Sequence, residues 1–382
     1  MAKQLLRNVR LWASTVDTGF TSENCFEVQV QDDLSWSQGT STSTVELSEA
    51  GATPDRGSAE FNDSLDPVDW NFSTYIRTYI KEYDPDGTPD NGDEEDHKLT
   101  TDSILWQGLS SGSAYAPHTG SNGVTTDETE MKVDFLDNAH HELLKLNFFI
   151  LADKVWYKIT GVQVGEAVLS NDITAIGATA WSGQGTSFER LTAEPTDLIN
   201  NATNIDCALS APYIKNKLTV IQVEDNDSNT VYSVPITGGS ITISNNITYL
   251  TPSTLSCLDV PIGSFTGAFS VEGEFTAYLD DQVGGTADLM DDLVTARQVT
   301  NSFTISVIMG GKYAAGAPAA VLVLKNAQMR IPTPTTEDVL SVALGFKGIP
   351  SNFGSAVSDE LVIGFSDNYT DTQIDAFITA NT

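Results

Sequence analysis

Apolar and polar residues alternate along most of this chain, in short runs that are separated by Gly, Asn, Asp and Pro. Alternation of this kind predicts β-strands with one buried face. Clear examples of expected strands lie at 26–31, 240–244, 302–309 and 320–324. The pattern therefore predicts a mainly β protein.

Helical spacing of apolar residues is restricted to a few stretches. It occurs at 135–146 and 287–299, and again at 370–380, where Thr370 or Asp371 can act as the N-cap. We expect these helices to flank the strands.

The stretch NDITAIGATAWSGQG, at 171–185, ends in Gly-x-Gly and so resembles a phosphate-binding loop. Such a loop needs a helix directly after its glycines, because the helix N-terminus binds the anion. The following residues, TSFERLTAEP, are too few for that helix and end in Pro. We therefore expect a strand that ends at a turn, with Trp181 as a packing anchor.

Sequence blocks from the first half recur in the same order in the second half. The number of residues that separates a block from its partner is near 207 for the first blocks. It falls to roughly 153 at the helices of 135–146 and 287–299, and rises again to 165 at the last strand. The paired blocks are 7–12 with 215–220, 33–37 with 240–244, 57–61 with 263–269, 70–76 with 273–279, 146–151 with 302–308, and 172–183 with 337–348. Their order predicts a duplicated β unit.

The predicted division is a first domain at 1–193, a polar linker at 194–204 and a second domain at 205–382 that ends in the C-terminal helix. The first copy carries an inserted loop at 81–130, which is rich in Asp-Gly, Asn-Gly and Ser-Gly turn signals.

The net charge of −33 excludes several classes of partner. So acidic a surface repels phosphates and anionic lipids, so we expect neither nucleic-acid binding nor membrane adhesion. The N-terminus lacks the apolar core of a signal peptide, and no run is long enough to span a membrane. The three cysteines form no spaced pairs, which predicts free, buried thiols.

Candidate catalytic and metal-binding patterns fail on inspection. The acidic stretch 84–96 lacks the glycine of a calcium loop, which leaves a loose cation site as an alternative to a solvated tip. His140 and His141 are adjacent and so face different sides of the predicted helix, which disfavours zinc. We expect no enzyme activity, no catalytic residue, no metal site and no cofactor.

Three stretches of the first half carry a resemblance to a known family. GSAEFNDSLDPVDWNFSTYIRTYI, YKITGVQVGEAVLS and DITAIGATAWSGQGT together resemble the tail tube proteins of tailed bacteriophages. The resemblance implies two tandem tail-tube-type β-sandwich domains, each with a flanking α-helix, which contribute to a large inner β-barrel on assembly. It also implies the duplicated-domain type, whose chains form trimeric rings of pseudo-six-fold symmetry.

The function implied by this resemblance is structural. Stacked rings would form a hollow conduit with an acidic lumen for DNA ejection, assembled in the host cytoplasm and located in the virion tail. The implied partners are further copies of the chain, the tape measure, tail terminator and baseplate or tip proteins, and a sheath protein if the tail is contractile; DNA passes through without specific binding. The alternative is an acidic β-sandwich adhesin, or a tail-tip or baseplate component, that binds host-surface glycans.

Two sets of candidate residues follow. Those expected to face the lumen, with outward solvent as the alternative, are Asp32, Asp33, Glu60, Asp63, Glu272 and Glu274. Those expected in a ring-stacking loop, with a disordered surface loop as the alternative, are Asp84, Asp86, Asp90, Asp93, Trp106 and Tyr115. Deletion of 84–126 is expected to block stacking and leave both domains folded.

Overall fold

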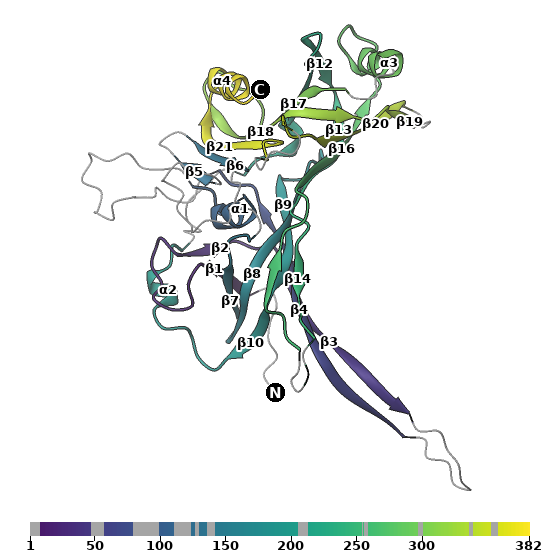
Figure 1. Ribbon diagram of the computed structural model, residues 1–382. Coiled ribbons are helices and arrows are strands. Elements are labelled where there is room, and N and C mark those ends of the chain that lie inside the picture. The colour runs from purple at the N-terminus through teal and green to yellow at the C-terminus, as the bar shows by residue number, and fades with distance from the viewer. Residues whose placement is uncertain are drawn as a thin grey trace, which may run out of the picture.

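The computed structural model describes residues 8–46, 57–78, 99–110, 124–126, 130–135, 142–204, 213–253, 255, 259–296, 301–335, 339–352 and 358–382. Strands dominate these residues and the helices are few, so the predicted mainly β fold is confirmed. The molecule is elongated, and one long sheet runs from β3 and β4 at one end to β19 and β20 at the other (Figure 1).

The elements of the first half follow each other in the order β1 (Val9–Ser14), β2 (Cys25–Val28), β3 (Ser35–Glu46), β4 (Ser58–Tyr75), α1 (Ser103–Ser110), β5 (Val124–Thr126), β6 (Met131–Asp134), β7 (Leu146–Ala152), β8 (Val155–Ser170), β9 (Ala178–Gly185), β10 (Ser187–Leu191) and α2 (Leu198–Asn201). Those of the second half are η1 (Asn216–Leu218), β11 (Val220–Asp225), β12 (Thr230–Val234), β13 (Ile236–Ser244), β14 (Thr248–Leu250), β15 (Gly263–Phe265), β16 (Ser270–Tyr278), α3 (Thr286–Ala296), β17 (Phe303–Met309), β18 (Ala317–Met329), β19 (Thr333–Thr335), β20 (Ser341–Gly348), β21 (Val362–Tyr369) and α4 (Asp371–Ala380).

Strand β8 belongs to two layers because it bends in the middle. Its first part pairs with β7 and β10, and its last part pairs with β9. Gly161 adopts a φ of 63°, which a glycine tolerates without strain, and a β-bulge follows between Val164 and Glu166. The buried side chains of both layers meet in one core cluster, in which Trp70 and Phe148 lie edge to face with ring centroids 4.9 Å apart.

The same long sheet continues into the second half of the chain. β13 pairs antiparallel with the end of β8, with Ser240 opposite Ser170 and Ser244 opposite Glu166. We use the name "long sheet" for the series β3, β4, β9, β8, β13, β16, β20 and β19.

A second connection joins the halves on the other layer. β6 pairs with β21, with Val133 opposite Ile363, and β5 pairs with β6. The β5–β6 hairpin of the first half therefore extends the layer β12–β11–β17–β18–β21 of the second half.

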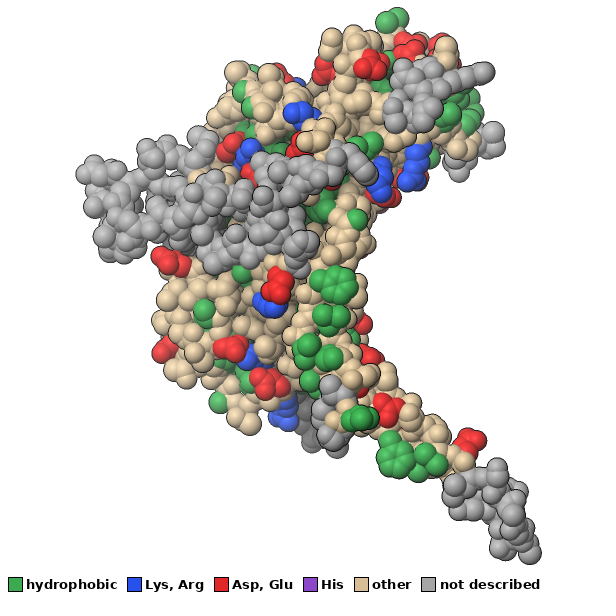
Figure 2. All heavy atoms as spheres, viewed as in Figure 1, with side chains coloured by type: hydrophobic (Ala, Val, Ile, Leu, Met, Phe, Trp, Pro, Cys, Tyr) green, Lys and Arg blue, Asp and Glu red, His purple; other side chains and the backbone are tan. Residues whose placement is uncertain are grey.

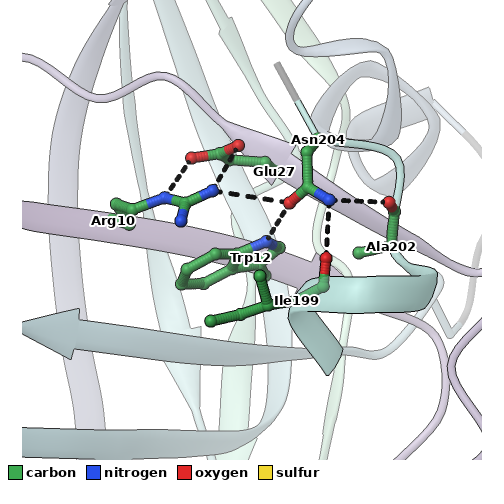
Figure 3. Close-up of polar contacts among 6 residues, drawn as sticks. All are labelled: Arg10, Trp12, Glu27, Ile199, Ala202 and Asn204. Carbon is green, nitrogen blue, oxygen red and sulfur yellow. Dashed lines mark hydrogen bonds and ion pairs between the residues drawn. The ribbon is translucent and has the colours of Figure 1, made fainter. Parts of the chain in front are cut away.

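The segment after β10 is held on β1 and β2 by Asn204 (Figure 3). Its Oδ1 accepts a hydrogen bond of 3.1 Å from Trp12 Nε1, and its Nδ2 donates to the carbonyl oxygens of Ile199 and Ala202. Arg10, which forms two hydrogen bonds to Glu27, also approaches Asn204. The end of the predicted linker is thus packed against the first half.

Several local predictions are confirmed. The stretch 171–185 ends in β9 with no helix after it, and Trp181 is 1% exposed. Helix α3 covers most of 287–299, and α4 begins at Asp371 after Thr370, whose hydroxyl accepts from the Gln373 N–H in a capping box. Cys25 is buried and free; Cys207 and Cys257 lie outside the described residues.

The helix expected at 135–146 is not found in the described part of that range. Phe135 and residues 142–145 are not helical, β7 begins at Leu146, and 136–141 lie outside the described residues. In the described part of the first half, α1 falls inside the range predicted to be an inserted loop, and the short helix α2 lies in the range predicted to be the linker.

Gly273 provides a test of packing in the long sheet. A Cβ atom at Gly273 would lie 2.3 Å from the ring of Phe346 on the neighbouring strand, whereas one at Gly263 meets no atom within 4 Å. We expect Gly273→Ala to lower the free energy of unfolding by about 1–3 kcal/mol, the usual cost of overpacking, and Gly263→Ala to leave it nearly unchanged. Urea unfolding of both variants checks this, and equal midpoints would contradict it.

Candidate functional site

The long sheet has one face in the core and one face outside it. Along β4, the side chains of Trp70 and Phe72 are buried, whereas those of Asp69, Asn71 and Ser73 point to the opposite side. The registers place partly or fully exposed residues of neighbouring strands opposite one another, so these side chains share one continuous face.

Small and hydroxyl-bearing side chains dominate this outer face. Its members include Ser35, Ser37, Asp69, Asn71, Ser73, Glu166, Val168, Ser170, Ala178, Ala180, Ser182, Gln184, Ser240, Thr242, Ser244, Glu272, Glu274, Thr276, Ala343 and Lys347. Long side chains are few, so the surface is smooth and polar.

The carboxylates of this face differ in the groups that hydrogen-bond or ion-pair with them. Gln184 Nε2 donates to Asp69 Oδ1 at 2.8 Å. Lys347 Nζ lies 2.7 Å from Glu272, and Arg330 lies 3.6 Å from the same carboxylate. The hydrogen bond from Lys347, with a smaller contribution from Arg330, holds the pKa of Glu272 below its usual range.

The predicted lumen-facing acids occupy three places. Glu272 and Glu274 lie on the outer face of β16. Asp32 and Asp33 precede β3, where Asp33 accepts from the backbone N–H and the hydroxyl of Ser73.

Glu60 and Asp63 lie on the part of β4 that projects from the body, where they accept from the hydroxyls of Thr42 and Ser43 respectively. Sequence reasoning did not single out Asp69 and Glu166, which lie on the outer face of the long sheet. The signal for Asp69 was its alternation with the buried Trp70.

The ends of β3 and β4 form a two-stranded arm that projects beyond the body (Figure 1). Val45 is 46% exposed and Phe61 is 57% exposed, and their register places them on the same side of the arm. β14 and β15 form a shorter hairpin that runs beside the base of this arm and bears the exposed apolar residues Leu250, Ile262 and Phe265. Figure 2 shows apolar side chains along this lower part of the molecule.

The predicted stacking-loop residues must be corrected at one position. Trp106 lies in α1, is 0% exposed, and packs edge to face on Trp181 with ring centroids 4.8 Å apart. Its side chain belongs to the core and is not available to another subunit. Asp84, Asp86, Asp90, Asp93 and Tyr115 lie outside the described residues.

The burial of α1 also overturns the expected result of deleting 84–126. That deletion removes α1, all of whose residues are buried, together with β5. Both are parts of the folded body, so the deletion cannot leave the first half intact.

A buried polar chain links α1 to the long sheet. Trp181 Nε1 donates to Thr74 Oγ1 at 2.9 Å, and Thr74 Oγ1 donates to Asp102 Oδ2 at 3.1 Å. Asp102 precedes α1 and is 3% exposed. Burial raises the pKa of Asp102 from 3.8 to about 6, although its hydrogen bonds oppose the shift.

None of the helices in the described ranges is long and apolar enough to cross a membrane. In the part of the chain that the structure describes, no cluster of His, Cys, Asp and Glu side chains is suited to a metal ion. The acidic stretch 84–96, with His140 and His141, lies outside those residues.

Among the described residues, the strands at the two ends of the long sheet, β3 and β19, each pair on one side only, and β3 and β4 extend into a projecting arm; an unpaired edge can accept a strand from another chain. The family model for phage tail tube proteins matches residues 14–348. The chain is 42% identical over 380 residues to tail tube protein pb6 of Escherichia phage T5, which covers 99% of this chain and 79% of that protein. The chain therefore belongs to the phage tail tube protein family.

The chain is thus a structural, non-enzymatic component of the phage tail, and its copies assemble into a tube in the virion. Membership in this family favours the tube over the alternative of a glycan-binding adhesin or tail-tip component.

Asp102 allows a test of how α1 is held. Between pH 4 and 6 the folded state binds more protons at this carboxyl than the unfolded state does, because its folded pKa is about 6 and its ordinary value is 3.8. The contribution of Asp102 to stability is therefore lost as the pH rises through this range. In Asp102→Asn that loss is absent.

We expect the free energy of unfolding of Asp102→Asn, minus that of the wild type, to increase from pH 4 to pH 7 and then to level off. Denaturant titrations at several pH values measure the difference. A difference that does not change with pH would show that Asp102 titrates alike in both states.

Proposed function

We propose that the chain consists of two quasi-equivalent units, 1–193 and 205–382 joined by 194–204, and that three chains close into a ring of pseudo-six-fold symmetry. Stacked rings then form the tube through which DNA leaves the virion. The packing of Asn204 on β1 and β2 supports counting the end of the linker with the first unit.

The main support is the strand pairing, which has the same pattern in both halves. In the first half β1 pairs with β2 and β7, β7 with β8, β8 with β9 and β10, and β4 with β9 and β3. In the second half β11 pairs with β12 and β17, β17 with β18, β18 with β20 and β21, and β16 with β20 and β13. Helix α1 lies between β4 and β7 as α3 lies between β16 and β17, so α1 replaces 135–146 as the proposed counterpart.

The registers correspond residue by residue. One row across the first unit reads Ser37, Asp69, Gln184, Gln163, and the matching row across the second reads Thr242, Glu272, Lys347, Gln328. The middle two side chains of each row form a hydrogen bond, at 2.8 Å from Gln184 to Asp69 and at 2.7 Å from Lys347 to Glu272. This match is the observation that carries the proposal.

Ring closure follows from the junction inside the chain. There β8 of the first unit pairs with β13 of the second, with Ser170, Leu169 and Val168 opposite Ser240, Ile241 and Thr242. Their counterparts at the open edges lie in β19 and β3. We therefore infer that Thr335, Pro334 and Thr333 of one chain lie opposite Ser35, Trp36 and Ser37 of the next.

The outer face of the long sheet lines the lumen in this ring. Short hydroxyl side chains leave the bore unobstructed, and Asp69, Glu166 and Glu274 repel DNA phosphates. Among the predicted lumen acids, Glu272 and Glu274 fit this place best, whereas Glu60 and Asp63 belong to the arm. The proposed partners at the tube ends and in the bore remain the tape measure, terminator and baseplate or tip proteins.

Rings stack through the arms. Exposed Val45 and Phe61 lie on one side of the β3–β4 arm, and burial of such side chains against the next ring is favourable by about 25 cal/mol per Å² of apolar surface.

Gln38 tests the ring-closing edge. The backbone N–H of Ser73 donates to the Asp33 carboxylate and its C=O accepts from the Gln31 N–H, so the backbone polar groups of Ser73, and of Asn71 two residues before it, point toward β3. Asn71 and its partner Ser35 are therefore a hydrogen-bonded pair, and the N–H groups of Trp36 and Gln38 point to the open edge of β3. Gln38→Pro removes that N–H without loss of a backbone β3–β4 hydrogen bond, and the bond from the Gln38 side chain to the Asp66 carbonyl is lost equally in Gln38→Ala. We expect Gln38→Pro to fold but stay monomeric, and Gln38→Ala to form rings.

Sedimentation velocity and negative-stain microscopy distinguish these outcomes, with the melting temperature as the check on folding. A folded Gln38→Pro variant that forms rings like the wild type would refute closure through β3.

Phe61 tests stacking separately from closure. We expect Phe61→Asp to form single rings but not tubes, because the added charge opposes burial against the next ring. Asn62→Asp adds the same charge on the opposite side of the arm and is expected to form tubes. Tube lengths in micrographs provide the measurement, and tubes of wild-type length in Phe61→Asp would exclude this contact.

A further inference from the structure

A cavity of about 480 Å³ lies in the second half of the chain, between α3 and the ends of β17, β18 and β20. Its lining includes Leu293 of α3, Phe303 of β17, Met329 of β18 and Lys347 of β20, with Arg330 directly after β18. The cavity plays no part in the contacts described so far.

The corresponding place in the first half is largely occupied, and a smaller pocket of about 360 Å³, whose lining includes Gly165, Gln184 and Ile247, lies beside it. By strand register, Phe303, Gln328, Met329 and Lys347 correspond to Leu146, Gln163, Val164 and Gln184. The segment that follows β13 and leads through β14 and β15 lies there.

Hydrogen bonds to the first half hold this segment in place. The backbone N–H of Asn245 donates to Gly165 O at 2.9 Å, and Asn245 Nδ2 donates to the Leu109 carbonyl of α1 at 2.8 Å. The Tyr249 hydroxyl donates to Gly161 O at 2.7 Å, and the Ser264 hydroxyl donates to Gln163 Oε1.

We propose that the cavity is the docking slot for the base of the β3–β4 arm of a second copy of this chain. The inference rests on the proposed ring, in which β3 is the counterpart of β13. The residues that follow β13 fill the slot of the first unit, so those that follow the start of β3 are placed to fill the slot of the second.

Charge supports this occupant. Arg330 and Lys347 are 67% and 52% exposed, and both lie near the single carboxylate of Glu272. Their counterparts in the filled slot are the uncharged Gly165 and Gln184. Arg330 and Lys347 therefore make the β18–β20 side of the open slot basic, while Asp225, Asp227 and Asp292 line its β11 and α3 side.

The two segments that occupy the slots differ in their number of acidic residues. The segment 245–265, which fills the slot of the first unit, has Asp259 as its single acidic residue. The β3–β4 arm and its base carry Glu46, Glu60, Asp63 and Asp66. An acidic arm thus meets the basic side of the slot, at Arg330 and Lys347, which favours the correct pairing.

The acidic residues of the slot lie on its other side, toward β11 and α3. Asp225 accepts from the Asp227 N–H and the Ser228 hydroxyl, and Asp292 accepts from the Tyr232 hydroxyl. Asp227 also lines the cavity, on the β11 side away from β20.

Asp66 is the arm residue that the register brings to Arg330. In the register set by the matched row, Thr40 of β3 corresponds to Asn245, which follows β13. Asn245 contacts Gly165, and Gly165 is the counterpart of Arg330. Asp66 lies beside Thr40, since its carboxylate is next to Gly39 and its carbonyl accepts from Gln38. Asp66 of a second copy therefore forms an ion pair with Arg330.

A charge exchange tests the contact. We expect Arg330→Glu and Asp66→Arg to shift the protein from rings to monomers, each by more than tenfold in the concentration needed for assembly. The double variant Asp66→Arg with Arg330→Glu restores rings, because the pair is re-formed with reversed signs. Lys217→Glu makes the same charge change at an exposed site outside the cavity and leaves assembly unchanged.

Sedimentation velocity over a concentration series, with melting temperatures as the folding control, separates the outcomes. If both single variants form rings at the same protein concentration as the wild type, the proposed docking slot is wrong and the ring proposal still holds. Loss of rings that the double variant does not restore overturns the Asp66–Arg330 pair. If the wild type forms no rings, the ring proposal fails, and the slot fails with it.

Discussion

The antiparallel pairing of β8 with β13 is the interaction on which the rest of the structure depends. It carries the long sheet from one half of the chain to the other, and it needs the bend at Gly161 that turns β8 from one layer into the next. On the opposite layer, the β6–β21 pairing holds the same two halves together. In the proposed ring, these two pairings make each chain a pre-formed pair of units.

The junction between chains would be weaker than the one within the chain. In the first half the β5–β6 hairpin lies between α1 and β7, whereas in the second half the connection from α3 to β17 consists of 297–302. In addition, Pro334 stands at the position of Leu169 and has no N–H to donate. An edge strand that carries proline is also less able to pair with unintended strands before assembly.

Packing explains why the repetition is faint in the sequence. In the first half, Trp70 of β4 fills the space above Gly183 of β9, and in the second half, Phe346 of β20 fills the space above Gly273 of β16. The aromatic and the glycine have exchanged strands, while the volume between the strands is filled in both. Close packing constrains the summed volume of neighbours more than the identity of each residue.

The strands, α3 and α4 could be predicted from the sequence because alternation, helical spacing and capping are local signals. Helix α1 could not, because SILWQGLS is buried on every side and has no polar face to reveal its period. The surrounding turn signals then made 81–130 resemble one loop, and Trp106 was placed in it. Glu166 was missed for a related reason, since the bulge after Val164 shifts the alternation by one residue.

The distribution of charge refines how the proposed lumen would act on DNA. Although the chain has a net charge of −33, the outer face of the long sheet bears few carboxylates, and that of Glu272 is balanced by Lys347 and Arg330. Dense acid is unnecessary there, because the field of a carboxylate extends about 8 Å at physiological ionic strength. Sparse acids repeated around a ring can hold phosphates off the wall, while short hydroxyl side chains between them stay hydrated, and the long side chains of Lys347 and Arg330 are paired with Glu272.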